Sequence, residues 1–201
     1  MYIRNDITSC QIDTSCYSTE IQEIFATRIL LPSRKGKTRT LLLASVYMRP
    51  ETGKSAVGNF DWISDWRNKH CADYIIIGGD FNARHRNWKY PTTSPRDSAL
   101  QATVETYGFI LQNYLETPTR LGLHTNQSDT IPDLTWTDGW YLNDWMVSEN
   151  TWGSDHYPIW ITLDKPLPKP IPKLFNTTNW ESFRAAAIDT NNITSIGDLA
   201  A

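Results

Sequence analysis

Short hydrophobic runs, separated by polar and glycine-containing turns, recur along most of the chain. They occupy residues 21–31, 40–47, 74–78, 109–115, 134–136, 145–147 and 157–163. Each is rich in Ile, Leu, Val or aromatic residues and has the length of a β-strand. The pattern predicts a fold with many strands.

Two segments between these runs repeat their apolar residues with a helical period. They cover residues 57–70 and 95–107. The second is flanked by the signals that begin and end helices: Ser94 as a cap, Pro95 in the first turn and Gly108 as a left-handed stop. Strands of mixed spacing with occasional crossover helices predict an α/β sandwich.

After the last apolar run, proline occupies every second position from 166 to 172. Proline fixes φ and removes a hydrogen-bond donor, so this stretch predicts an extended spacer. Beyond it, Thr178 and Glu181 have the spacing of a capping box that opens a short helix. We therefore predict a domain over residues 1–164, a proline-rich linker over 165–178, and a short helix with a tail over 179–201.

Composition and charge narrow the class of protein. Hydrophobic residues make up 40% of the chain and aromatic residues 12%, which excludes a disordered chain. The net charge of −3 excludes a global positive field, so any polyanion must be held locally. No apolar run approaches the ~20 residues of a membrane span. Three unclustered cysteines and a start without a secretory signal predict an intracellular protein with reduced thiols.

Polar residues suited to catalysis lie where predicted strands begin or end. Tyr47 ends one strand, Asp80 and Asn82 follow another, and Asp133 begins a third; the Asp155–His156 pair precedes the last strand. Ligands of α/β sheets bind at the carboxyl ends of strands. A carboxylate at 133 could accept a ring N–H from His156 and orient it. An ordinary Gly-Asp-Asn turn and a structural histidine remain the alternatives.

The order of these elements resembles the endonuclease/exonuclease/phosphatase superfamily, which has the DNase I-like fold. The strings G-G-D-F-N-A-R-H from Gly78, P-T-R from Pro118, P-D-L-T from Pro132 and S-D-H from Ser154 narrow the resemblance. They are similar to the apurinic-type endonuclease domain of non-LTR retrotransposons. The resemblance covers residues 1–163 and implies an α/β, four-layered sandwich in which two packed mixed β-sheets are flanked by helices.

The resemblance also implies roles for the candidate catalytic residues. Asp80 would orient or deprotonate the attacking water, with Asn82 as its neighbour. His156 would donate to the phosphate, Asp133 would orient His156, and Tyr47 would add a second phosphate contact. Asp155 would help to bind a divalent metal, Mg²⁺ or Mn²⁺, for which oxygen ligands are suitable.

The same resemblance implies DNA as substrate. In the full-length element it also implies a reverse transcriptase domain of the same polyprotein as partner and a nuclear location. A cationic cluster follows Asp80 and could meet DNA phosphates, although a solvated loop is an equal alternative. Its members are Arg84, His85, Arg86 and Lys89. Arg120 lies in a polar stretch whose counterpart in the family reaches toward the nucleic acid.

One departure from the family pattern bears on activity. Family members carry a metal-ligand Glu in an L-Q-E-like strand, upstream of a strand that resembles Tyr2-Ile3-Arg4. In the family pattern the strand that resembles Tyr2-Ile3-Arg4 is the third, after one that carries an Asn and one that carries the Glu. This sequence starts at that third strand, so we expect a domain that lacks its first strands and nicks DNA poorly. The alternatives are a non-catalytic remnant that binds DNA weakly or not at all, and a phosphatase or phosphodiesterase acting on RNA or a small phosphoester.

Overall fold

The computed structural model describes the chain except for residues 32–37, 51–59, 71, 124–126, 139–141 and 164–201. The described residues belong to one compact unit, Met1–Leu167. The predicted linker over 165–178 and the predicted helix and tail over 179–201 lie outside the described residues. Among the described helices, none has the length and apolar character needed to cross a membrane.

A six-stranded sheet forms the centre of the unit, in the order β1-β2-β3-β4-β6-β5. Only β3 and β4 are parallel; the other neighbours are antiparallel. A second, two-stranded antiparallel sheet pairs β7 with β8. The bounds are β1 Ser9–Ile12, β2 Gln22–Leu31, β3 Arg39–Met48, β4 Tyr74–Asp80, β5 Phe109–Leu111, β6 Asp133–Asp138, β7 Asp144–Val147 and β8 Ile159–Thr162.

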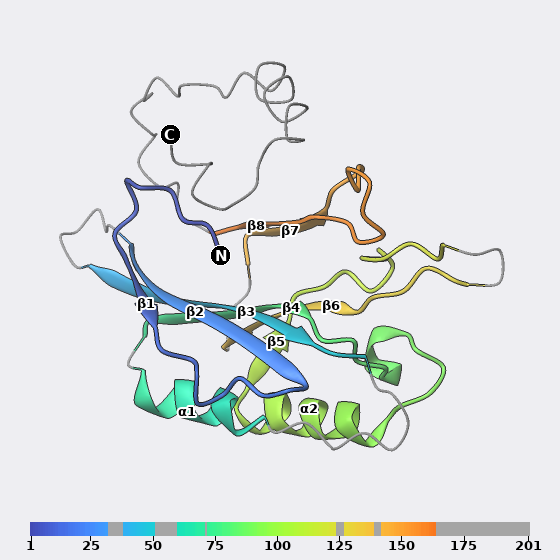
Figure 1. The fold of residues 1–201 in the computed structure, drawn as a ribbon, viewed down its shortest axis with the longest axis horizontal. Coiled ribbons are helices and arrows are strands. Elements are labelled where there is room, and N and C mark those ends of the chain that lie inside the picture. Colours follow the sequence, from blue (N-terminus) through green and yellow to red (C-terminus); the bar gives the residue numbers. More distant parts are fainter. Residues whose placement is uncertain (32–37, 51–59, 71, 124–126, 139–141, 164–201) are drawn as a thin grey trace, which may run out of the picture. The chain divides into compact units, whose positions relative to one another are not determined.

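Both described α-helices cover one face of the large sheet, and β7 and β8 lie on the other side (Figure 1). Helix α1 spans Asp61–Lys69 and α2 spans Pro95–Thr106; a 3-10 turn, η1, covers Arg86–Trp88. The predicted cap of α2 is confirmed, because the Ser94 side chain accepts from the backbone N–H of Asp97. The mixed α/β fold with two sheets is therefore as predicted. Within the described ranges both helices lie on the same side, so a fourth layer is not seen there.

The strands alternate between two hydrophobic clusters, as a period of two requires. On β3, Leu42, Ala44, Val46 and Met48 face the cluster on the helix side. The opposite face contributes Leu41 to a smaller cluster, against which Ile161 of β8 packs. This second face is the one toward the small sheet (Figure 1), and the candidate residues Tyr47, Asp80 and Asp133 share it by register.

Two details differ from the sequence-based expectations. Tyr2-Ile3-Arg4 is not a strand; the first strand is Ser9–Ile12, which no apolar run marked. Its residues are exposed except for the partly buried Ile12, so an edge strand of this kind has no hydrophobic alternation to detect. The strand predicted over residues 109–115 is also shorter and ends at Leu111.

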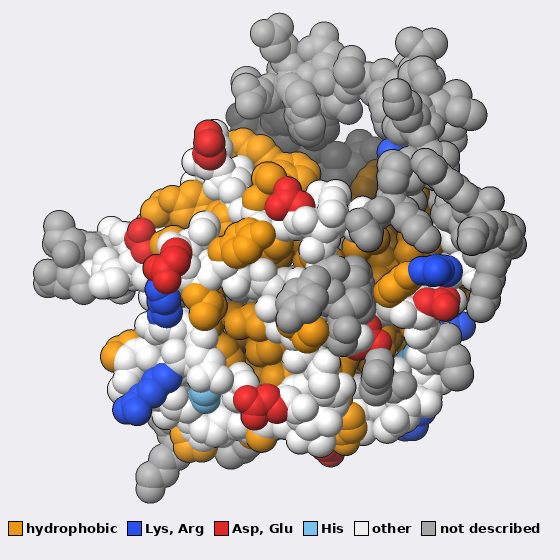
Figure 2. All heavy atoms as spheres, turned by 180° about the vertical axis from the view of Figure 1, so that it is seen from behind, with side chains coloured by type: hydrophobic (Ala, Val, Ile, Leu, Met, Phe, Trp, Pro, Cys, Tyr) orange, Lys and Arg blue, Asp and Glu red, His pale blue; other side chains and the backbone are white. Residues whose placement is uncertain are grey.

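Seen from behind, Figure 2 shows hydrophobic side chains over the centre of the surface, with acidic and basic side chains scattered around them. The described side chains on this face therefore do not gather into the single-sign field that is typical of a polyanion-binding surface.

Candidate active site

Strand register brings three of the candidate residues into one row. Tyr47 of β3 is the register partner of Asp80 of β4, and Asp80 is opposite Asp133 of β6. Register partners in a sheet point to the same face, so these three side chains share the face toward β7 and β8. Two carboxylates directly opposite each other destabilise a sheet. Such a pair is therefore typical of a functional site.

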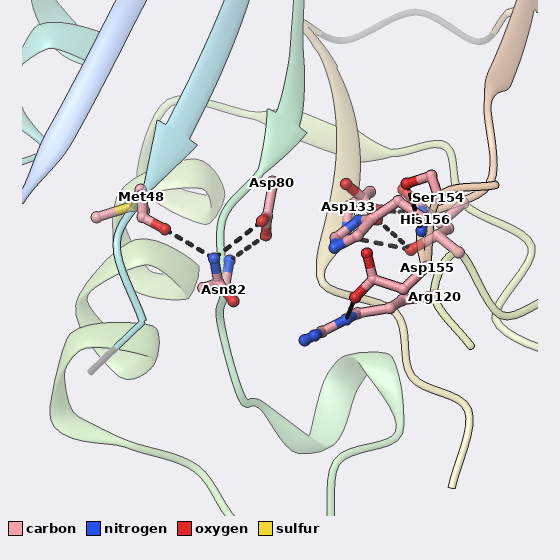
Figure 3. A network of polar contacts seen from close by, with 10 residues as sticks. Met48, Asp80, Asn82, Arg120, Asp133, Ser154, Asp155 and His156 are labelled. Carbon is pink, nitrogen blue, oxygen red and sulfur yellow. Dashed lines mark hydrogen bonds and ion pairs between the residues drawn. The ribbon is translucent and has the colours of Figure 1, made fainter. Parts of the chain in front are cut away.

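A tight turn after β4 fixes Asp80. Asn82 donates its backbone N–H to Asp80 Oδ1 and its side-chain Nδ2 to Asp80 Oδ2, both at 2.9 Å. The same Nδ2 donates to the backbone carbonyl of Met48 at 2.8 Å, which ties the end of β4 to the end of β3 (Figure 3). Asn82 has φ +43, a left-handed conformation that asparagine tolerates better than most residues. The turn thus sets the orientation of the Asp80 carboxylate.

One glycine before this carboxylate permits the close approach of the two strands. Gly79 has φ +149, and a Cβ at this position would lie 1.9 Å from the carbonyl oxygen of Val46 on β3. Gly78 has room, since the nearest atoms to its Cβ position are 3.9 Å away. The spacing between β3 and β4 at the site therefore depends on Gly79 specifically.

Electrostatics at Asp80 favour a bound positive charge. Burial raises the pKa of the Asp80 carboxyl above 3.8, and the negative charge of Asp133 adds to that rise. The backbone N–H of Asn82 lowers the same pKa, as do the nearby His156 and Arg120. A carboxylate that is costly to ionise in isolation is stabilised when a cation or a positively charged group approaches.

The predicted pairing of Asp133 with His156 is confirmed. His156 Nδ1 lies 2.8 Å from Asp133 Oδ2. The same oxygen accepts a hydrogen bond from Thr119 Oγ1 at 2.8 Å, and the Thr119 side chain is fully buried. With Nδ1 occupied by a carboxylate, the other ring nitrogen, Nε2, is the atom that can meet a substrate.

The segment that carries His156 is docked on the segment around Arg120. Leu121 donates its N–H to the carbonyl of Asp155, and Tyr157 donates to the carbonyl of Thr119, both at 2.8 Å. These backbone bonds join the loop before β8 to the loop before β6. They hold the His156 ring beside the row of carboxylates, although the two loops are distant in sequence.

Asp155, predicted as a metal ligand, has a different neighbour in the structure. Its Oδ2 lies 2.8 Å from Nε of Arg120, and this bond keeps the pKa of the Asp155 carboxyl below its usual value. Arg120, predicted to contact DNA, is therefore half of an ion pair (Figure 3). Asp155 and His156 thus serve different partners.

The group that fits a metal ion best is Asp80, Asp133 and His156. Each offers one ligand atom, and these atoms all lie within 4.8 Å of one another. Two carboxylates match the small number of protein ligands with which Mg²⁺ is commonly held, and the His156 ring lies beside them as a hydrogen-bond donor. The residues present therefore fit a divalent cation, and Asp155 is not a member of this group.

The predicted cationic cluster is only partly available to a ligand. Arg84 and Arg86 are exposed. Lys89 forms an ion pair with Glu116. His85 caps η1 by accepting the N–H of Asn87 at Nδ1, and its ring packs on Trp88. The two arginines are thus the better candidates for phosphate contacts within the cluster.

Sequence reasoning missed two buried charges at the start of α2, Arg96 and Asp97, both 1% exposed. Arg96 donates to the carbonyl of Arg49 at 2.9 Å and to the carbonyl of Asn82 at 3.1 Å. Asp97 accepts the backbone N–H of Arg84 at 2.5 Å. Together they hold the turn after Asp80 from both sides. An acidic residue in the first turn of a helix, such as Asp97, is a known sequence signal, but it indicates the start of the helix and not a role beside the site. No sequence signal marks Arg96.

Fold and site together define a DNase I-like α/β protein with an acid–histidine site at one end of its sheets. Residues 41–160, more than half of the chain, match the family described as endonuclease-reverse transcriptase. The chain belongs to this family.

Among solved structures, one with a TM-score above 0.5 supports the fold. The endonuclease domain of TRAS1, a telomere-specific non-LTR retrotransposon, matches with a TM-score of 0.61 and 20% identity, over 81% of this chain and 71% of that domain. An endonuclease/exonuclease/phosphatase family protein from Leptotrichia buccalis matches with a TM-score of 0.45 and 10% identity, over 82% of this chain and 74% of that protein. A Cimex nitrophorin matches with a TM-score of 0.45 and 13% identity, over 78% of this chain and 63% of the nitrophorin. A search of curated proteins finds no match.

Proposed function

We propose that this domain hydrolyses phosphodiester bonds of DNA and nicks the target of a non-LTR retroelement. The nick would leave a 3′-hydroxyl from which a reverse transcriptase domain of the same polyprotein primes synthesis. The observation that carries the proposal is the convergence of Asp80, Asp133 and His156, whose ligand atoms lie within 4.8 Å of one another. The family of the chain supports the interpretation of this cluster as a nuclease site.

Hydrolysis needs a water molecule aligned with the bond that breaks. Asp80 is suited to orient that water and to accept its proton, because its carboxylate lies opposite Asp133 in the row and is held in place by Asn82. Asn82 bonds both carboxylate oxygens and so limits the directions from which Asp80 can accept.

Negative charge grows on the phosphate oxygens as the water attacks, and a positive donor there lowers the barrier. His156 is assigned this role, with Nδ1 held by Asp133 and Nε2 directed to a phosphate oxygen. Asp133 stabilises the protonated ring, in which both nitrogens donate. Tyr47, in the same row and partly exposed, supplies a second contact through its hydroxyl.

A divalent cation held by Asp80 and Asp133 would supply Lewis-acid stabilisation of the developing charge. Two carboxylates make a sparse ligand set, so we propose that affinity for Mg²⁺ is weak and that nicking by this chain is slow. For binding, Arg84 and Arg86 are proposed as the phosphate contacts, since both are exposed.

Conversion of supercoiled plasmid to the nicked circle, with protein in excess over DNA, tests the proposal. We expect slow nicking with Mg²⁺ or Mn²⁺, no nicking with EDTA, and loss of nicking in His156→Ala. Trp160→Ala, an exposed position on β8, is the matched control. The proposal fails if no metal supports nicking, or if His156→Ala nicks within about threefold of the parent, too small a loss for a transition-state contact.

A further inference from the structure

Trp152 is unusual among the tryptophans that the structure describes. Its side chain is 69% exposed, whereas Trp62, Trp66, Trp88 and Trp145 are fully buried. No described ring packs against it, although most of the other described tryptophans take part in a ring contact. Its exposed ring is therefore available to a partner, although exposure alone does not set it apart, since Trp160 is also 54% exposed.

The backbone at Trp152 is also in a conformation that the residue type does not favour. Its φ is +51, in the left-handed region, and the next residue is Gly153 with φ +89. Strain of this kind persists only where the surroundings impose it, and it is concentrated at functional sites. A glycine or asparagine would fit this position more easily.

The turn holds its shape without the tryptophan side chain. Asn150 Oδ1 accepts the backbone N–H of Trp152 at 2.7 Å, and Ser148 Oγ accepts the N–H of Asn150 at 3.2 Å. Ser154 donates its N–H to the carbonyl of Thr151 at 3.1 Å. All three bonds use backbone or neighbouring polar groups. The indole ring is therefore presented by the turn and is not needed to build it.

This turn runs directly into the segment that carries His156. The two residues are four positions apart, so their Cα atoms are separated by no more than about 14 Å. Successive phosphates of one DNA strand are about 3.4 Å apart along the axis. Trp152 is therefore within about four nucleotides of a phosphate held at His156.

We propose that Trp152 is a base-stacking contact for the DNA strand, within about four nucleotides of the phosphodiester that is cleaved. This inference rests on the proposed function. An aromatic ring can stack on the face of any base that is unstacked from its neighbour in the duplex, so it adds affinity without adding positive charge. Such a contact suits a protein of net charge −3 in which Lys89 and Arg120 are already paired with acidic side chains.

Binding of a fluorescent DNA duplex, measured by anisotropy in EDTA to prevent cleavage, tests the contact. We expect Trp152→Ala to weaken binding by about 5- to 150-fold, the range found for loss of one stacked base. Trp152→Phe keeps an aromatic face and should bind within about threefold of the parent. Trp160→Ala removes a second exposed tryptophan, 54% exposed on β8, and should leave binding unchanged.

Two further measurements separate stacking from a folding defect or from loss of charge. The slope of log affinity against log salt should be the same in Trp152→Ala and the parent, because no phosphate contact is removed. Trp152→Asn, which suits the left-handed backbone, should lose as much affinity as Trp152→Ala and unfold at no lower temperature than the parent.

Duplexes with one abasic nucleotide at successive positions locate the base. We expect one position, within about four nucleotides of the nick, at which the parent loses affinity and Trp152→Ala loses none. If the parent binds and nicks DNA but Trp152→Ala binds equally well, the stacking contact is refuted and the proposed function stands. If Trp160→Ala weakens binding as much, the effect is non-specific and the contact is also refuted. If the parent binds no DNA, both proposals fail.

Discussion

Asp133→Asn changes one charge at the centre of the site and keeps the shape of the side chain. In the parent, Asp133 Oδ2 accepts from His156 Nδ1 and from Thr119 Oγ1, each at 2.8 Å. The side chains of His156 and Asp133 are only 28% and 14% exposed, so water can replace little of the hydrogen bond that the substitution weakens. An asparagine carries no charge with which to stabilise a protonated histidine.

The expected rate loss follows from the bond that disappears. A hydrogen bond to a charged group contributes about 1.5–3 kcal/mol. His156 would use this bond mainly when it is positively charged, as phosphate charge develops. At about 1.4 kcal/mol for each factor of ten, we expect nicking to slow by about 10- to 150-fold. The affinity for DNA should change by less than about threefold, since the bond is not made to the ground-state substrate.

Single-turnover nicking of supercoiled plasmid gives the rate, and anisotropy in EDTA gives the affinity. Glu149→Gln is the control, because it removes one negative charge from an exposed position on the segment between β7 and β8. We expect the control to nick at the parental rate. A rate for Asp133→Asn within about threefold of the parent, or a loss of affinity as large as the loss of rate, would refute the assigned role of the Asp133–His156 pair.

Three further predictions follow from the geometry around Asp80. Gly79→Ala should lower the free energy of unfolding by about 3 kcal/mol or more, because its Cβ would meet a backbone oxygen at 1.9 Å. Gly78→Ala should cost under about 1 kcal/mol in the same urea titration, and equal losses would contradict the reasoning. Arg96→Lys keeps the charge, but an ammonium group cannot replace the planar guanidinium whose two nitrogens donate to two carbonyls. We therefore expect nicking to slow by about 5- to 30-fold. A rate equal to the parent's would show that the two hydrogen bonds of the Arg96 guanidinium are not needed for nicking. In the protein without bound metal, kept so by EDTA, the Asp80 carboxyl should titrate with a midpoint above 3.8 in a carboxyl NMR titration, since burial raises the pKa of Asp80. Asp133→Asn should move that midpoint down, because it removes the negative charge that adds to the rise; an upward movement would contradict this.

Much of the site could be predicted because strand ends are visible in a sequence. The apolar runs before Asp80 and after Asp133 predicted the positions of β4 and β6. A short polar residue at the end of such a run indicates a candidate site residue. The Asp133–His156 bond was predicted from residue types and their positions beside strands, with a structural histidine as the alternative, and it forms at 2.8 Å. Local patterns and side-chain chemistry were sufficient for these residues.

Other parts depend on contacts between segments that no local pattern reveals. Arg120 pairs with Asp155 because two loops dock through backbone bonds, whereas the family resemblance implied a different role for each residue. Arg96 lies in a helix and bonds backbone carbonyls, which have no sequence signature. The edge strand Ser9–Ile12 is mostly exposed, so hydrophobic periodicity cannot detect it.

The row of Tyr47, Asp80 and Asp133, completed by His156, also bears on when the site can first exist. Its members come from strands and a loop that are far apart in the chain, and such non-local pairings form late in folding. During synthesis at about 5–20 residues per second, Asp80 leaves the ribosome about 4–15 s before His156. A nascent or partly folded chain therefore presents isolated carboxylates and no acid–histidine pair. The acid–histidine pair therefore exists only after both segments have been synthesised and have folded together.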